Sequence, residues 1–250
     1  MPEGNRDAIH NILRESDLFS RLGGRKLRAY QSEVAGAVID SVLNQRGLSL
    51  AVMFPRQSGK NELQAQLEAY LLLLHHTQDV EIVKVSPTWR PQSLNAMRRL
   101  ERVLRSQPLA EQVGWARENG YMIRVGRARI SFFSGEAQSN IVGATASLLL
   151  EVDEAQNVGI EKFDTQIAPM AASTDATRVF WGTAWTVDTL LARELRAAQR
   201  IEAGDGLRRV FRRDALEIGQ VVPAYARFVA GQVERLGREH PSVRTQYFSE

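Results

Sequence analysis

Short apolar runs alternate with stretches of helical periodicity along most of this 250-residue chain. The first clear run, Leu48 to Phe54, is partly β-branched, stops at Pro55, and precedes helical periodicity from Glu62 to Leu74. The next run, Ile82 to Val85, also gives way to an amphipathic helical pattern. Parallel strands need crossover connections, which helices usually supply. The alternation therefore predicts an α/β fold with a mostly parallel central sheet flanked by helices.

The remaining segments extend this pattern toward both ends of the chain. Tyr121 to Val125 and Ala128 to Phe133 lie on either side of Gly126-Arg127, and their alternating polarity predicts a hairpin with a short turn. We expect helices within residues 6–46, a last helix at Ala224–Arg238, and further strands at Leu148–Val152, Arg178–Trp181 and Arg208–Arg212. The pattern indicates three parts: a helical entry segment (1–46), a core (47–188), and a small C-terminal lid or linker subdomain (189–250).

Composition excludes several classes of protein. The chain has no cysteine, so it has no disulfide and no thiolate zinc site. Its most apolar run, Leu71 to Leu74, is too short to cross a bilayer, and its polar start lacks the pattern of a secretory signal. We therefore expect an intracellular protein with no membrane partner. The net charge of +3 permits contact with nucleic-acid phosphates, although solvated surface arginines are the commoner reading of such a charge.

The turn between the first strand and its helix has the residue types of a phosphate-binding loop. It reads Phe54-Pro55-Arg56-Gln57-Ser58-Gly59-Lys60-Asn61. Gly59 allows close approach of the backbone, Lys60 supplies a positive charge, and the helix that follows directs its positive end at the same place. Phe54 stands where the usual pattern has glycine, and Asn61 where it has serine or threonine. Taken alone, the segment is more typical of a plain surface turn.

A second chemical signal lies at the end of a later apolar strand. Leu148 to Val152 is followed by Asp153 and Glu154, at the strand end where parallel sheets bind ligands. Asp153 is suited to hold a hydrated magnesium ion, and Glu154 to orient and deprotonate a water molecule. We expect Glu151 to point away from this site. Without the upstream loop, the same acid pair is more typical of a helix N-terminus.

Several short motifs occur in one order along nearly the whole chain. They are Tyr30-Gln31, Arg56-Gln57-Ser58-Gly59-Lys60, Ser86-Pro87-Thr88-Trp89, Asp153-Glu154-Ala155-Gln156, Gly182-Thr183-Ala184-Trp185, and the segment from His240 to Tyr247. Together they resemble the N-terminal ATPase domain of large terminases, the DNA-packaging motors of tailed phages. In that family the loop commonly lacks its first glycine, so Phe54 is no departure from it.

The resemblance implies a phosphate-loop NTPase of the ASCE or RecA-like type, which uses ATP and Mg²⁺ to move double-stranded DNA into a procapsid. It implies catalytic roles for Glu154, Lys60 and Arg56. It implies nucleotide contacts from Tyr30, Gln31, Pro55, Arg56, Gln57, Ser58, Gly59, Lys60 and Asn61. Asp153 and Asn61 would hold the metal ion, and Gly182, Thr183 and Ala184 would couple the state of the nucleotide to movement.

The same resemblance sets expectations about partners and location. It implies backbone contact with duplex DNA, a portal protein, a small terminase subunit, and a homo-oligomeric ring in the packaging complex at the procapsid portal, in the cytoplasm of an infected bacterium. The ribonuclease-H-like nuclease domain that normally follows is missing from this sequence. Val142 replaces the arginine that some members carry before Gly143-Ala144-Thr145, which leaves Arg124, Arg127 and Arg129 as candidates for an arginine acting in trans.

Two other functions stay open on the sequence. A related helicase-like remodeller shares the glutamine motif and the phosphate loop, but it needs a second motor lobe. A non-catalytic nucleic-acid-binding or assembly module would use the loop only to grip anions. Magnesium-dependent phosphate release distinguishes the non-catalytic module from the packaging motor and the helicase-like remodeller.

Overall fold

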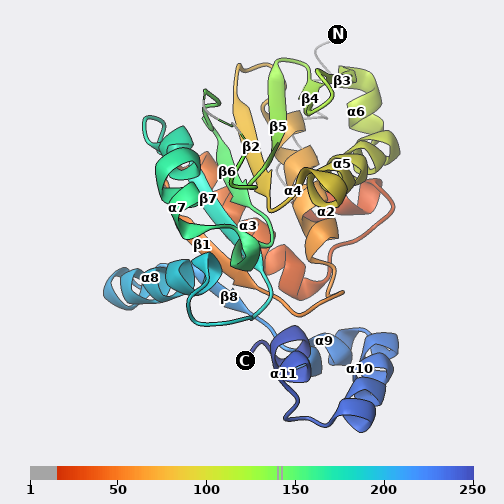
Figure 1. The fold of residues 1–250 in the computed structure, drawn as a ribbon. Helices are drawn as coiled ribbons and strands as arrows, with labels where there is room; N and C mark the ends of the chain where they lie inside the picture. Colours follow the sequence, from red (N-terminus) through yellow and green to blue (C-terminus); the bar gives the residue numbers. More distant parts are fainter. Residues whose placement is uncertain (1–15, 140, 142) are drawn as a thin grey trace.

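A single eight-stranded sheet forms the centre of the molecule (Figure 1). The computed structural model describes residues 16–139, 141 and 143–250. Six strands are mutually parallel in the order β5-β2-β6-β7-β1-β8, and β4 and β3 extend the β5 edge in antiparallel fashion. The strands are β1 Ser49–Met53, β2 Glu81–Ser86, β3 Trp115–Glu118, β4 Met122–Val125, β5 Ala128–Ser134, β6 Leu149–Val152, β7 Thr177–Gly182 and β8 Val210–Arg212. The predicted α/β class with a mostly parallel sheet is confirmed.

Helices cover both faces of this sheet. One face packs against α2 Ser16–Leu22, α3 Ala29–Leu43, α4 Lys60–Leu74, α5 Leu94–Ser106 and α6 Pro108–Val113. The other face packs against the short turns α7 Ile160–Lys162, η3 Phe163–Ile167 and η4 Ala168–Ala171, and the longer α8 Leu190–Asp205. Two further short turns, η1 Trp89–Ser93 and η2 Ala155–Asn157, follow β2 and β6. The described helices include none that is long and apolar enough to span a membrane.

The central helix α4 is buried on nearly every side. It packs against the sheet and against α3 and α5, and every residue from Leu63 to Leu73 is buried. A helix enclosed in this way has little solvent-facing surface, which explains why its sequence has little amphipathic contrast. Its buried polar residues Gln64, Gln66 and Glu68 need partners inside the protein. This packing fixes the first turn of α4, and with it the phosphate-loop candidate that precedes it.

We expect Leu71→Ala to lower the free energy of unfolding by about 2–5 kcal/mol, because the substitution leaves a cavity in a close-packed core. Leu71 is fully buried in the larger apolar cluster. Chemical denaturation measures the change. Leu43→Ala, at a side chain that is 49% exposed, is the control and should change stability by less than about 0.5 kcal/mol. Equal losses in the two variants would contradict this account of the core.

The predicted hairpin with a short turn is confirmed. In its register, Val125 pairs with Ala128 across the two-residue turn. The sequence reading missed β3, a four-residue edge strand, because none of its side chains is buried and it therefore lacks a buried apolar face. The expected helices of residues 6–46 appear as α2 and α3, and the part of that expectation at residues 1–15 lies outside the described residues.

The last helices form a small lobe, drawn below the sheet in Figure 1. They are α9 Ala215–Val221, α10 Pro223–Leu236 and α11 Pro241–Phe248. The lobe touches the phosphate-loop candidate directly, since the backbone N–H of Arg56 donates to the carbonyl of Gln246 at 2.9 Å. By contrast, α8 packs on one face of the sheet, and β8 is a strand of the sheet, paired with β1. The division of the chain at residues 46 and 188 stays a prediction.

Candidate active site

The loop after β1 enters α4 through backbone conformations that demand glycine at one position. Gly59 precedes α4 with φ of +89°, in the left-handed region. A Cβ atom there would lie 2.6 Å from Nε2 of Gln31, so any side chain would also collide with a neighbour. Gln57 adopts φ of +60° in the same turn. The loop is therefore held in one shape at the carboxyl edge of the sheet.

The loop lysine and the acidic strand end meet across this edge. Nζ of Lys60 lies 2.6 Å from Oε1 of Glu154. Asp153, only 5% exposed, accepts a hydrogen bond of 3.0 Å from Nε2 of Gln64 on α4. The two residues of each contact are about ninety positions apart in sequence, and they converge because parallel strands end at the same edge of the sheet. The structure thus brings together the two motifs that the sequence reading singled out.

Two adjoining cavities flank the contact between Lys60 and Glu154. The first, of about 470 Å³, is lined by the loop together with Glu62, Arg99, Glu154 and Thr183. Its volume is in the range of small-molecule sites. The second, of about 210 Å³, is lined by Asp153 and by several amide side chains. Arg56, Asn61, Arg99 and Glu154 line both cavities, so both can act on one ligand.

The second cavity has the donor atoms that suit magnesium. Asp153, Glu154, Asn61, Gln92, Asn95 and Asn157 present carboxylate and amide groups, and oxygen atoms are the ligands that Mg²⁺ prefers. Within the described residues, no group of three or more His, Asp or Glu side chains forms a metal site by itself. Magnesium is usually held by one or two carboxylates with water and phosphate, so this lining fits a metal ion that arrives with a nucleotide.

Tyr30 and Gln31 lie directly against the loop backbone. The hydroxyl of Tyr30 donates to the carbonyl of Ser58 at 2.5 Å, and Nε2 of Gln31 donates to the carbonyl of Gly59 at 2.9 Å. Oε1 of Gln31 accepts from the backbone N–H of Arg28 at 2.8 Å. Burial raises the pKa of Tyr30. These contacts support the shape of the loop, and contact with an adenine base stays a prediction.

Gln156 joins the acidic strand end to the end of β7. Its Nε2 donates to Oε2 of Glu154 at 2.6 Å, and its Oε1 accepts from the backbone N–H of Thr183 at 3.3 Å. The Thr183 hydroxyl also donates to the carbonyl of Phe54 at 3.2 Å. Gln156 thereby links Glu154 to Thr183, one of the residues expected to couple the state of the nucleotide to movement. The sequence reading quoted Gln156 within its motif but assigned it no role.

Glu151 lines neither cavity at the loop, in agreement with the expectation that it lies outside the site. Residues two apart in a strand share a face of the sheet. Glu151 therefore lies under α4, like Asp153, but it is fully buried and accepts a hydrogen bond of 2.8 Å from the indole of Trp181. Burial raises the pKa of Glu151 well above its usual value, and the positive charge of Lys84 offsets part of that rise.

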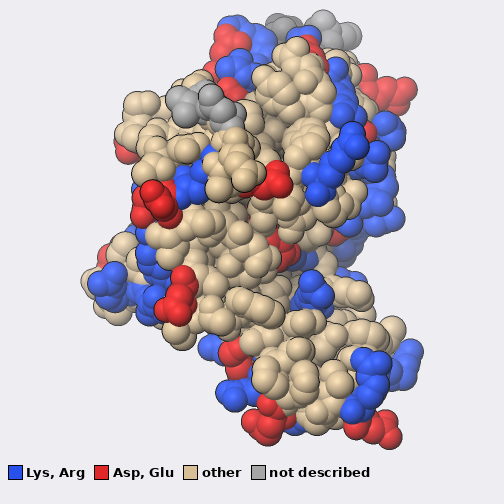
Figure 2. Space-filling view, in the orientation of Figure 1, with Lys and Arg blue, Asp and Glu red and all other residues tan. Residues whose placement is uncertain are grey.

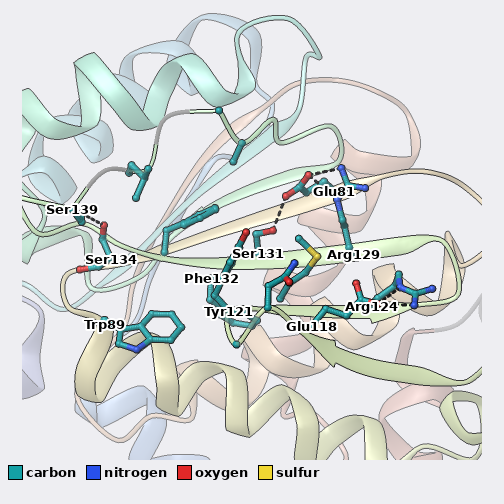
Figure 3. A pocket seen from close by; sticks show the side chains of 17 residues that line it. Glu81, Trp89, Glu118, Tyr121, Arg124, Arg129, Ser131, Phe132, Ser134 and Ser139 are labelled. Atoms are coloured by element: carbon teal, nitrogen blue, oxygen red, sulfur yellow. Dashed lines mark hydrogen bonds and ion pairs between the residues drawn. The ribbon is translucent and has the colours of Figure 1, made fainter.

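The three candidate trans arginines lie away from this edge. Register places Arg129 beside Glu81 at the amino-terminal end of the parallel strands, and Arg124 pairs with Arg129 across the hairpin. Each contacts a carboxylate: Arg124 contacts Glu118, Arg127 contacts Asp79, and Arg129 contacts Glu81. Figure 3 shows Arg124 and Arg129 beside a separate cavity of about 930 Å³. That cavity shares no lining residue with the two at the loop.

One cationic residue that the sequence reading left unassigned does face the site. Arg99, on α5, lines both cavities, and its NH1 lies 3.6 Å from Oε2 of Glu62. In the sequence it is one of several arginines with helical spacing, so nothing distinguishes it until the fold places α5 beside α4. The expected absence of a finger arginine at Val142 lies outside the described residues.

Comparison with known proteins places this geometry in a recognised fold. No protein-family description matches the chain, and no curated protein sequence does. The large-terminase ATPase domain of Thermus phage P74-26 aligns over 94% of this chain and 97% of its own, with a TM-score of 0.68 and 16% identity. The chain has the fold of large-terminase ATPase domains.

Longer large-terminase structures show the same likeness over part of their length. The HK97 bacteriophage large terminase aligns with a TM-score of 0.71 and 15% identity, over 90% of this chain and 51% of that protein. A thermophilic-phage large terminase solved in complex with ADP aligns with a TM-score of 0.60 and 13% identity, over 90% and 53%. This chain therefore spans about half the length of those terminases. At such identities the likeness establishes the fold.

Proposed function

We propose that this chain binds and hydrolyses Mg²⁺-ATP at the edge formed by Lys60, Asp153 and Glu154. The contact of 2.6 Å between Lys60 and Glu154, with Asp153 in the adjoining cavity, is the observation that carries the proposal. A triphosphate carries more negative charge than one carboxylate, so it would compete with Glu154 for Lys60. The released carboxylate could then orient and deprotonate an attacking water. Magnesium, when bound with the nucleotide, would neutralise phosphate charge.

We further propose that this activity drives double-stranded DNA into a phage procapsid, as in the large terminases whose fold the chain shares. In that role the protein would act as a ring with a portal protein and a small terminase subunit, in the cytoplasm of an infected bacterium. Gly182, Thr183 and Ala184 would couple nucleotide state to movement, since Gln156 connects Glu154 to this segment. One of Arg124, Arg127 and Arg129 would act on a neighbouring subunit.

Phosphate release in the presence of ATP, with and without magnesium and duplex DNA, tests the proposed function. Magnesium-dependent release that DNA stimulates is the expected result. Release that only single-stranded nucleic acid stimulates would favour the helicase-like remodeller. No release above background, with ATP still bound, would favour the non-catalytic nucleic-acid-binding module.

Basic side chains offer a surface for DNA phosphates. Figure 2 shows Lys and Arg side chains gathered along the side of the molecule that α5 occupies. Arg98, Arg102 and Arg105 are exposed and recur at helical spacing along α5. A packaging motor must move any sequence, so backbone contacts that ignore base identity suit this role. We propose this side as the DNA-contacting surface.

Replacing Arg98, Arg102 and Arg105 together by alanine should weaken duplex binding without changing sequence preference. Each lost phosphate contact should reduce the slope of log affinity against log salt by about 1. Fluorescence anisotropy with labelled duplexes of two unrelated sequences, over a salt series, measures both quantities. Alanine at Arg227, Arg235 and Arg238 of the C-terminal segment is the matched charge control. An unchanged salt slope in the α5 variant would exclude α5 as the surface.

Gly182→Ala should lower ATP turnover by about tenfold to a hundredfold, because it displaces a group that holds Glu154. A Cβ at this position would meet Oε1 of Gln156 and lie 2.6 Å from Cδ2 of Leu191. Steady-state phosphate release at saturating ATP measures the effect. Gly204→Ala, where a Cβ meets no atom within 4 Å, should leave turnover unchanged. Normal turnover in Gly182→Ala would show that the contact with Gln156 is dispensable.

A further inference from the structure

A buried group of polar side chains lies directly beneath the proposed metal site. Gln64 and Glu68 are one turn apart on α4, and Lys84 and Glu151 are neighbours on β2 and β6. All four are between 0% and 2% exposed. None of them is needed for the hydrolysis derived above, so their role requires a separate account.

Hydrogen bonds connect this group to Asp153. Nζ of Lys84 donates to Oε1 of Gln64 at 2.6 Å and also to Oε1 of Glu68. Nε2 of Gln64 donates to Oδ1 of Asp153 at 3.0 Å. Because an ammonium group only donates, Lys84 must face the amide oxygen of Gln64. The amide nitrogen of Gln64 is then the atom left for Asp153.

Stability alone gives little reason for these charges. A buried ion pair contributes about as much as well-packed apolar residues of the same volume, and often less. Burial alone would lower the pKa of Lys84, but the attraction of Glu68, Glu151 and Asp153 outweighs burial and raises that pKa. The lysine therefore stays protonated, and its hydrogen bond to Gln64 persists at neutral pH.

We propose that Gln64 is a positioning residue for the metal-binding carboxylate of Asp153, with its amide oriented by Lys84. Gln64 holds Oδ1 of Asp153, which leaves Oδ2 for the metal ion. Partners of this kind orient the groups that bind a metal and typically change metal affinity by about tenfold to a hundredfold when they are removed. The inference rests on the proposed function, because it assumes that Asp153 binds the metal of Mg²⁺-ATP.

Two substitutions at one position test the proposal. Gln64→Glu keeps an acceptor for Lys84 but cannot donate to an ionised Asp153, and Gln64→Leu removes both contacts. Mn²⁺ is the probe, titrated into the ATP-bound protein and followed by electron paramagnetic resonance, a readout that does not depend on turnover. Both variants should raise the Mn²⁺ concentration at half-saturation by about tenfold or more. Affinity for metal-free ATP should stay within about twofold.

Gln66→Leu is the matched control on the same helix. Gln66 is 4% exposed, and its Nε2 donates to the carbonyl of Arg25 and to Glu62, on the side away from Asp153. The Gln66→Leu variant should bind Mn²⁺ like the unaltered protein. Thermal unfolding shows whether all three variants are folded. Unaltered Mn²⁺ binding in a folded Gln64→Glu or Gln64→Leu would overturn the proposal. Equal weakening in Gln66→Leu would also overturn it. If the unaltered protein binds no Mn²⁺ with ATP, the proposed function itself fails.

Discussion

Glu154→Gln is expected to reduce ATP hydrolysis by about two to four orders of magnitude while ATP still binds. The substitution keeps the size of the side chain and can still hydrogen bond to Gln156, but an amide cannot accept a proton from water. Loss of the ion pair with Lys60 should leave ATP affinity equal or higher, since Lys60 no longer has a competing carboxylate. Single-turnover phosphate release and equilibrium nucleotide binding measure the two effects separately.

Glu161→Gln provides the control for this prediction. Glu161 lies on α7, is exposed, and lines neither cavity at the loop. The Glu161→Gln variant should hydrolyse ATP at the rate of the unaltered protein. Turnover in Glu154→Gln that matches this control would remove Glu154 from the role of general base.

Lys60→Met should weaken ATP binding by about thirtyfold to a thousandfold. This range corresponds to about 2–4 kcal/mol, which lies within the usual cost of removing one member of a desolvated charge pair. Lys60 is 6% exposed and lines the larger of the two loop cavities, so little solvent would compensate for its loss. Isothermal titration calorimetry with a slowly hydrolysed ATP analogue measures the change.

A lysine of equal burial serves as the control for Lys60. Lys162 is 7% exposed and its Nζ donates to the carbonyl of Ser139, away from the loop. Lys162→Met should affect stability more than nucleotide affinity. If both substitutions weaken ATP binding equally, the effect reflects general damage to the fold, and Lys60 has no special part in holding phosphate.

The chemistry of the candidate site was readable largely from local sequence. Gly59 and Lys60 follow a strand and open a helix, and Asp153 and Glu154 close another strand. Parallel strands align their carboxyl ends, so four residues in two distant segments predict one site. The structure bears out that convergence through the contact between Lys60 and Glu154. The hairpin was predicted from its short turn for a similarly local reason.

Other features had no local signal. The edge strand β3 lacks a buried face, so its sequence resembles a loop. Gln64, Lys84 and Gln156 are common polar residues, and only their burial beside Asp153 and Glu154 distinguishes them. The partners of Glu151, which is buried beneath the site and hydrogen bonded to Trp181, also had no signal in the sequence. The contact of Gln246 with the loop likewise depends on where the C-terminal lobe packs.

Most of the alternation of strands and helices, the shape of the phosphate-loop candidate and the acidic strand end were determined by the sequence itself, because backbone periodicity and glycine conformation act over a few residues. Which polar side chains support the site was decided only by the tertiary structure. Burial beside a particular partner gives an ordinary glutamine or lysine its role, and partners such as Gln64 and Lys84 come from segments that meet only when the sheet and α4 pack together.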